Sequence, residues 1–243
     1  MQKVIDEGEF AGHQAVILRP AKPFQLTELP REVRKRIYAI YFAPNGVVNG
    51  EIVLEGKDTK KNIFAKAYSE GQKDRVALLR VSKDVSFDAT QILYNHVLRI
   101  ESTTTLVDLL SQHEKYPTTK ANLRKLNVKS YIKTTSRTAL QLLAGSPHVS
   151  YLNFDLGVAG QDDTAKAAKD FHTDAERFFD AVYVEKKKSE KNKNFEKRDV
   201  VDILSFGREA FKRKLDKEKG GKAKAWDEDM REEFFENLKA KLK

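Results

Sequence analysis

The sequence predicts an α/β protein: an N-terminal helical module with a hairpin insertion, then a short curved parallel sheet of βα units closed by a C-terminal capping helix. Three observations predict this fold. A helical pattern follows a Leu-Pro pair, a strand-like template recurs through the second half, and helical stretches lie between its copies. We expect an arm over 1–23, the helical module over 24–94 and the βα region over 95–243.

The composition is that of a folded, basic protein. The 243 residues are 40% hydrophobic and include 14 phenylalanines, which is enough for a real core. An excess of 45 Lys+Arg over 36 Asp+Glu gives a net charge of +9. This balance favours acidic proteins or polyanions as partners and carries no information about the fold.

Cysteine is absent, which excludes disulfides, thiolate metal sites and cysteine nucleophiles. No segment approaches the roughly 20 apolar residues that a membrane-spanning helix needs. Acidic residues (Asp6, Glu7 and Glu9) precede any apolar run, unlike the start of a secretory signal. We therefore expect no membrane association and a location in the cytoplasm or nucleus.

The first helix is predicted from Pro30, because proline suits the first helical position. The residues that follow place a single apolar stripe along it, at Val33, Ile37, Ile40 and Tyr41. An Ala-Pro-Asn-Gly run then ends the helix.

An insertion over 43–75 follows. In it, Asn49-Gly50 lies between β-branched runs, which predicts a hairpin with a type I′ turn. A further strand is expected from Ile63 to Tyr68.

Helical patterns return from Asp74 to Tyr94, as two helices broken near Ser82. This stretch contains Leu-Leu-Arg-Val-Ser-Lys at 78–83 and a helix ending in Leu93-Tyr94. Together with the Leu-Pro-Arg-Glu-Val start of the first helix, these motifs resemble the fungal F-box-like domain over roughly the first 100 residues.

The resemblance implies a non-enzymatic adaptor in a cullin-type ubiquitin ligase. Its first helix would bind a Skp-type adaptor subunit through Leu29, Pro30, Val33 and Ile37, and the C-terminal region would hold an unknown target protein. The alternative is that the same stripe packs on the Leu79 to Leu93 helices. The protein would then be a basic binding scaffold for nucleic acid or acidic proteins.

A strand template with leucine at its centre repeats through the second half. These leucines are residues 98, 126, 152 and 204, so the steps are 28, 26 and twice 26 residues. Helices are expected over 104–112, 136–144 and 163–184, with Ser136 as an N-cap and Gly145 as a stop. This period is similar to that of irregular leucine-rich repeats. Ordinary βα units of a parallel sheet predict nearly the same local structure.

A basic loop is expected over 185–199, because this segment is rich in lysine and almost free of apolar residues. Its cationic patch consists of Lys186, Lys187, Lys188, Lys191 and Lys193. Only one aromatic residue, Phe195, accompanies these cations, whereas single-strand binding favours several. Solvated lysines are therefore the simpler interpretation, with weak, salt-sensitive binding of nucleic acid as the alternative.

The final helix is predicted over 226–242, where apolar residues recur every four positions: Trp226, Met230, Phe234, Leu238 and Leu242. Such a stripe fits a lid on the open end of the sheet, with a partner-binding helix as the alternative.

Catalytic motifs are missing: no two of the five histidines are three or four residues apart, and no glycine-rich phosphate loop occurs. We expect no catalysis, no cofactor and no metal.

Overall fold

The computed structural model describes residues 2–4, 7–9, 11–12, 14–16, 25–46, 50–57, 62–65, 73–112, 117–160, 162–188, 194–212 and 225–242. The chain divides into two compact units, Met1–Arg34 and Lys35–Lys243. The boundary falls within helix α1 (Arg31–Tyr41).

The first unit contains two short strands, β1 (Gln2–Val4) and β2 (Gln14–Val16), which pair antiparallel. A 3₁₀ turn, η1 (Leu26–Glu28), precedes α1. The predicted arm therefore contains a small two-stranded antiparallel sheet.

The second unit is an α/β domain built on one six-stranded sheet with the order β4-β3-β5-β6-β7-β8. Five strands are parallel to one another: β3, β5, β6, β7 and β8. Strand β4 pairs antiparallel with β3 and forms one edge of the sheet. The strands are β3 (Ile52–Lys57), β4 (Asn62–Ala65), β5 (Leu98–Ser102), β6 (Lys125–Ser130), β7 (Tyr151–Ala159) and β8 (Leu204–Phe211).

The register aligns the leucines of the sequence template. Leu98 pairs with Leu126, Leu126 with Leu152, and Leu152 with Leu204, so one template position forms one row across four strands. Ile52 of β3 continues that row beside Leu98. The template therefore predicted the strands β5 to β8, and the structure aligns its leucines in one row.

The helices of this unit are η2 (Pro44–Gly46), η4 (Lys73–Arg80), α3 (Lys83–Leu93), α4 (Thr103–Ser111), α5 (Pro117–Asn122), α6 (Lys133–Leu143), α7 (Thr164–Lys187), η6 (Lys197–Ile203) and α8 (Glu228–Lys241). The helices expected in this unit are present with shifted ends, and three further short helices (η2, α5 and η6) were not predicted. At the start of α3, α4, α7 and α8, the N-cap side chain accepts a hydrogen bond from a backbone N–H of the first turn. Ser82, for example, accepts a hydrogen bond from the backbone of Val85, which places the predicted break between η4 and α3.

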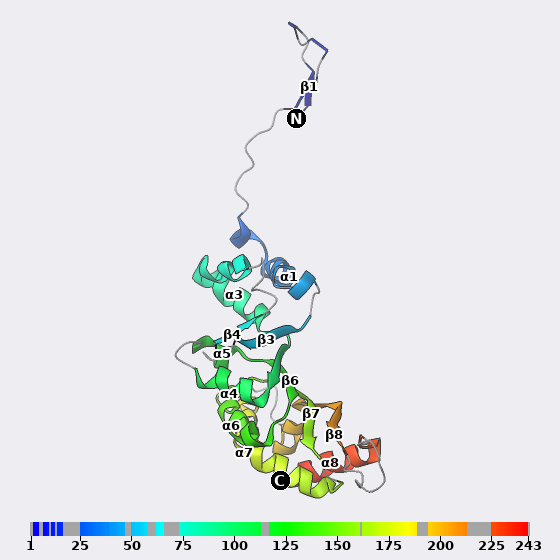
Figure 1. The fold of residues 1–243 in the computed structure, drawn as a ribbon. Coiled ribbons are helices and arrows are strands. Elements are labelled where there is room, and N and C mark those ends of the chain that lie inside the picture. Colours follow the sequence, from blue (N-terminus) through cyan, green and yellow to red (C-terminus); the bar gives the residue numbers. More distant parts are fainter. Residues whose placement is uncertain are drawn as a thin grey trace, which may run out of the picture. The chain divides into compact units, whose positions relative to one another are not determined.

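The long helices form one layer. From β5 to β8, strands adjacent in sequence are adjacent in the sheet, and right-handed crossovers between such strands put the connecting helices on the same face. Accordingly α4 packs on α6, α6 on α7, and α7 on α8, and Figure 1 shows α4, α6 and α7 following one another along one side of the strands. Phe154 of β7 and Phe206 of β8 contact Phe171 of α7, which identifies the helix-covered face.

The insertion contributes an antiparallel strand pair to the sheet, and the strand expected from Ile63 is present as β4. Strand β3 pairs with β4 and also with β5, so the insertion forms one edge of the main sheet. The predicted hairpin turn was Asn49-Gly50. Asn49 and the two residues before it lie outside the described part of the chain.

Two predicted boundaries are wrong. Ser136 does not cap α6: the N-cap is Ile132, and the buried Ser136 hydroxyl donates instead to Asp174 of α7. Helix α7 also continues to Lys187, three residues beyond its predicted end. Lysines in a last turn are favoured by the negative end of the helix dipole, so Lys186 and Lys187 extend the helix rather than a loop.

The C-terminal helix α8 packs on α7 and η6 and contacts aromatic side chains of β8. Trp226, just before α8, stacks on Phe211 of the last strand with ring centroids 4.5 Å apart, and Phe234 and Leu238 of α8 are buried. Arg231 of α8 donates hydrogen bonds to the backbone carbonyls of Gly207 and Arg208 on β8. Within the described part of the chain, no helix has the length and apolar content that crossing a bilayer requires.

Candidate functional site: the polar face of the sheet

The face of the sheet opposite the helices carries a row of polar side chains. Side chains alternate along a strand, so the residue after each template leucine faces away from α4, α6 and α7. Four of these residues are register partners across β5 to β8: Arg99, Asn127, Asn153 and Ser205.

Five of the side chains on this polar face close a ring. Arg99 contacts Glu51 at 3.1 Å, and the amide of Asn127 donates to the other oxygen of Glu51 at 2.9 Å. The amide of Asn153 donates both to Asn127 at 2.9 Å and to Asp155 at 2.7 Å. The Asp155 carboxylate lies 3.9 Å from the Arg99 guanidinium, which completes the ring.

The ring is rigid at its centre and accessible at its charged corners. Asn127 and Asn153 are only 8% and 6% exposed, whereas the Arg99, Glu51 and Asp155 side chains are each partly exposed. A buried amide is costly unless it is hydrogen-bonded, and here each amide orients the next. Gly207 of β8 lies against Asp155: a Cβ at Gly207 would come within 2.8 Å of the Asp155 Cα.

The polar side chains of this face are paired with one another. Both ring carboxylates already accept hydrogen bonds from neighbouring side chains, and a second ion pair, Lys129 with Glu101 at 2.7 Å, lies on the same face. The surface therefore presents donors and acceptors of both charge signs. Among the described residues, no group of three or more His, Asp or Glu side chains is arranged to hold a metal ion.

The predicted docking residues of the first helix are partly exposed. Leu29 lies between η1 and α1 and is half-buried, and Pro30 is exposed just before α1. Val33 is 42% exposed, Ile37 is half-buried, and Ile40 further along the same helix is 67% exposed.

The predicted basic patch is divided by the structure. Lys186 and Lys187 lie in the last turn of α7 and Lys188 is its C-cap, while Lys191 and Lys193 lie outside the described residues. Lys186 sits 4.9 Å from the centre of the Phe195 ring, and burial lowers the pKa of its ammonium group, with Asp202 and Asp199 acting in the opposite direction.

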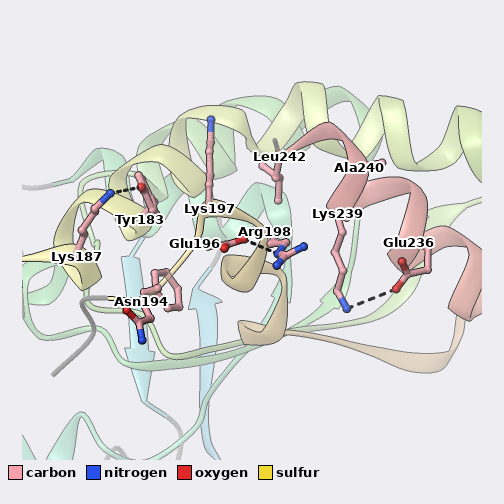
Figure 2. A pocket seen from close by; sticks show the side chains of 11 residues that line it. Tyr183, Lys187, Asn194, Glu196, Lys197, Arg198, Glu236, Lys239, Ala240 and Leu242 are labelled. Atoms are coloured by element: carbon pink, nitrogen blue, oxygen red, sulfur yellow. Dashed lines mark hydrogen bonds and ion pairs between the residues drawn. The ribbon is translucent and has the colours of Figure 1, made fainter.

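A cavity of about 810 Å³ opens beside this patch, between the ends of α7 and α8 and the η6 turn. Figure 2 shows that most of its cations are already engaged: Lys187 with Tyr183, Arg198 with Glu196, and Lys239 with Glu236. Lys197 points toward α7, where it pairs with Asp180 at 2.6 Å. Paired cations at helix ends stabilise those ends, so this cavity has little free charge to offer a ligand.

The polar ring was missed in the sequence. One signal for part of it exists, since Asn127 and Asn153 occupy the same position of the repeated template, between two buried apolar residues. Glu51 could not be found this way, because it lies 76 residues from its partner Asn127.

No family model, curated protein or solved structure matches this chain.

Proposed function

We propose that this chain is a non-enzymatic adaptor of the F-box-like kind, which holds a partner protein on the polar face of its sheet. The observation that carries the proposal is the single-sided layer of helices. It leaves one face of a five-strand parallel sheet with ordered polar side chains, from Glu51 on one side to Asp155 on the other.

The repeat-like organisation supports the same proposal. Strand-and-helix units at a period of 26 to 28 residues, in sequential order, are typical of leucine-rich-repeat-like sheets. Such sheets use the face without helices as an extended binding surface. The ring on that face is ordered before a partner arrives, which lowers the entropy cost of binding.

Exposed apolar side chains on α1 support the second part of the proposal, docking of a Skp-type subunit. Val33 and Ile40 keep 42% and 67% of their surface exposed. A helix with only a structural role would bury such a stripe, whereas a docking helix needs part of it free.

The α1 docking surface is tested by capture on an immobilised Skp-type subunit. We expect the wild type to be retained and a Leu29→Ala, Pro30→Ala double variant to be lost, with melting temperatures close together. Val81→Ala is the matched control, since Val81 is 68% exposed but lies outside the stripe. Failure of the wild type to bind, together with a large drop in the variant's melting temperature, would assign this helix to structure alone.

The polar face of the sheet is tested with charge reversal. An Arg99→Glu, Lys129→Glu variant should lose the partners that the wild type retains in affinity purification from its own cells. Arg177→Glu, an exposed change on α7, should keep them. Identical partner sets for all three proteins would show that this face holds no partner.

A further inference from the structure

A second groove, independent of the polar face of the sheet, lies between α3 and α5. Its volume is about 710 Å³. Helix α3 contributes Lys83, Ser86, Phe87 and Thr90, the end of η4 contributes Arg80, and Arg124 follows α5.

The charge of this groove is positive and unneutralised. Three cations line it (Arg80, Lys83 and Arg124), and none of the described lining residues is acidic. Arg80 and Lys83 are exposed and form no ion pair with any described residue. The cations of the cavity at the ends of α7 and α8 differ in this respect, because they are held by Asp180, Glu196, Glu236 and Tyr183.

The third cation is fixed in place. The Arg124 guanidinium donates hydrogen bonds of 2.9 Å to the carbonyls of Ala121 and Leu123. Burial lowers the pKa of this guanidinium, though from a value so high that it stays charged. The groove therefore has one anchored cation and two cations that pair with no described residue.

One aromatic ring lies open in the same groove. Phe87 is 62% exposed, an unusual position for so large an apolar side chain. It follows Lys83 by four residues on α3, so the two share one face of the helix, and Thr90 and Gln91 continue that face one turn further. The groove thus offers in order a cation, a flat ring and side chains that form hydrogen bonds.

We infer that this groove binds a short stretch of single-stranded nucleic acid. The phosphates lie against Arg80, Lys83 and Arg124, and a base stacks on Phe87 with its edge toward Thr90 and Gln91. Cations that follow a backbone and an aromatic ring that stacks a base are the two components of single-strand recognition. An acidic or phosphorylated peptide would use the cations but would leave the exposed ring without a role.

The expected binding is weak and strongly dependent on salt. Three phosphate contacts on a single strand give a slope of about −2 in a plot of log K against log salt concentration. Between about 50 and 200 mM salt this slope corresponds to a loss of about 20-fold in affinity.

The test is fluorescence anisotropy with a labelled oligothymidylate of about 8 nucleotides at about 50 mM salt. We expect Arg80→Gln, Lys83→Gln to weaken binding about 10-fold or more, because two phosphate contacts are lost. Phe87→Ala should weaken it by about 10-fold through lost stacking. The matched control is Arg198→Gln, Lys239→Gln, which removes two paired cations from the other cavity and should leave binding unchanged.

Several outcomes would overturn the inference. If the control double variant lost as much affinity for the oligonucleotide as Arg80→Gln, Lys83→Gln, the oligonucleotide would be attracted by the net charge of the protein alone. Unchanged binding by Phe87→Ala, with displacement of the oligonucleotide by inorganic phosphate, would mean a simple anion site. Tighter binding of a phosphorylated peptide or of duplex DNA than of the single strand would identify a different ligand class, and no binding at about 50 mM salt would exclude the site.

Discussion

Asn153 on β7 donates a hydrogen bond from its side-chain amide to the amide oxygen of Asn127 on β6, 2.9 Å away. The two residues are register partners and stand 26 positions apart, one full repeat of the sequence template. The repeat therefore aligns more than apolar side chains: it also places two amides in one row on the polar face of the sheet. That pair connects the Asp155 side of the ring to the Glu51 side.

Truncation of this amide should destabilise the domain. Asn153→Ala removes the donor to both Asn127 and Asp155 at a buried position, and we expect a loss of about 1–3 kcal/mol in the free energy of unfolding. Urea denaturation measures it. Asn122→Ala is the control, since that side chain bonds only a carbonyl of its own helix and should cost less. Equal costs for the two variants would contradict a structural ring.

Gly207 should tolerate no side chain. An alanine Cβ there would approach the Asp155 Cα to 2.8 Å and its carbonyl oxygen to 3.0 Å, and backbone atoms of a central strand cannot move aside cheaply. We expect Gly207→Ala to cost about 1–3 kcal/mol in thermal or urea unfolding. Gly160→Ala has no heavy atom within 4 Å of the added Cβ and should stay within about 0.5 kcal/mol of the wild type. Similar stabilities would mean that β8 can shift away from β7.

Four strands of the sheet could be predicted from the sequence because the leucine-centred strand template is repeated. Leu98, Leu126, Leu152 and Leu204 recur at steps of 28, 26 and twice 26 residues, and a pattern that occurs four times is recognised despite local variation in sequence. Helix ends were less readable. Ser136 has the right residue type for an N-cap, but its hydroxyl is used by Asp174, 38 residues away, and tertiary contacts of that kind leave no local trace.

The two candidate surfaces were hidden for the same reason. Arg80 and Arg124 reach one groove only because residues of η4, α3 and α5 meet there. The basic patch predicted from the sequence, at Lys186 to Lys188, is instead a helix end. Spacing along the chain identifies residues on one element. It does not identify which elements meet.

The apolar residues of α1 and of the position just after it should differ in their importance for stability. Phe42, just after the helix, is fully buried, so Phe42→Ala should cost about 3–5 kcal/mol in the free energy of unfolding. Ile40 is 67% exposed, so Ile40→Ala should cost no more than about 0.5 kcal/mol. Guanidinium denaturation of both variants separates them. A large cost for Ile40→Ala would mean that this side chain is buried in the free protein and cannot serve docking.

The hydroxyl of Tyr131 should make stability depend on pH in the alkaline range. It is buried and donates a hydrogen bond of 2.6 Å to Asp174, which also accepts one from Ser136. Burial first, and then Asp174, raises the pKa of this phenol above its ordinary value of 10.0. The folded protein therefore keeps the proton at a pH where the unfolded chain releases it.

This difference in proton binding fixes the sign of the effect. Below pH 10 both states hold the proton, and the contribution of the hydroxyl to stability is complete. Above pH 10 the unfolded state binds fewer protons, so stability falls as pH rises, by up to about 1.4 kcal/mol per pH unit. The Tyr131→Phe variant has no phenol proton to lose. Near neutral pH its free energy of unfolding should be about 1.5–3 kcal/mol below that of the wild type, and this difference should become smaller above pH 10. Urea unfolding of both proteins between about pH 7 and 11 measures the difference, and a constant deficit across that range would show that the phenol ionises equally in the folded and unfolded states.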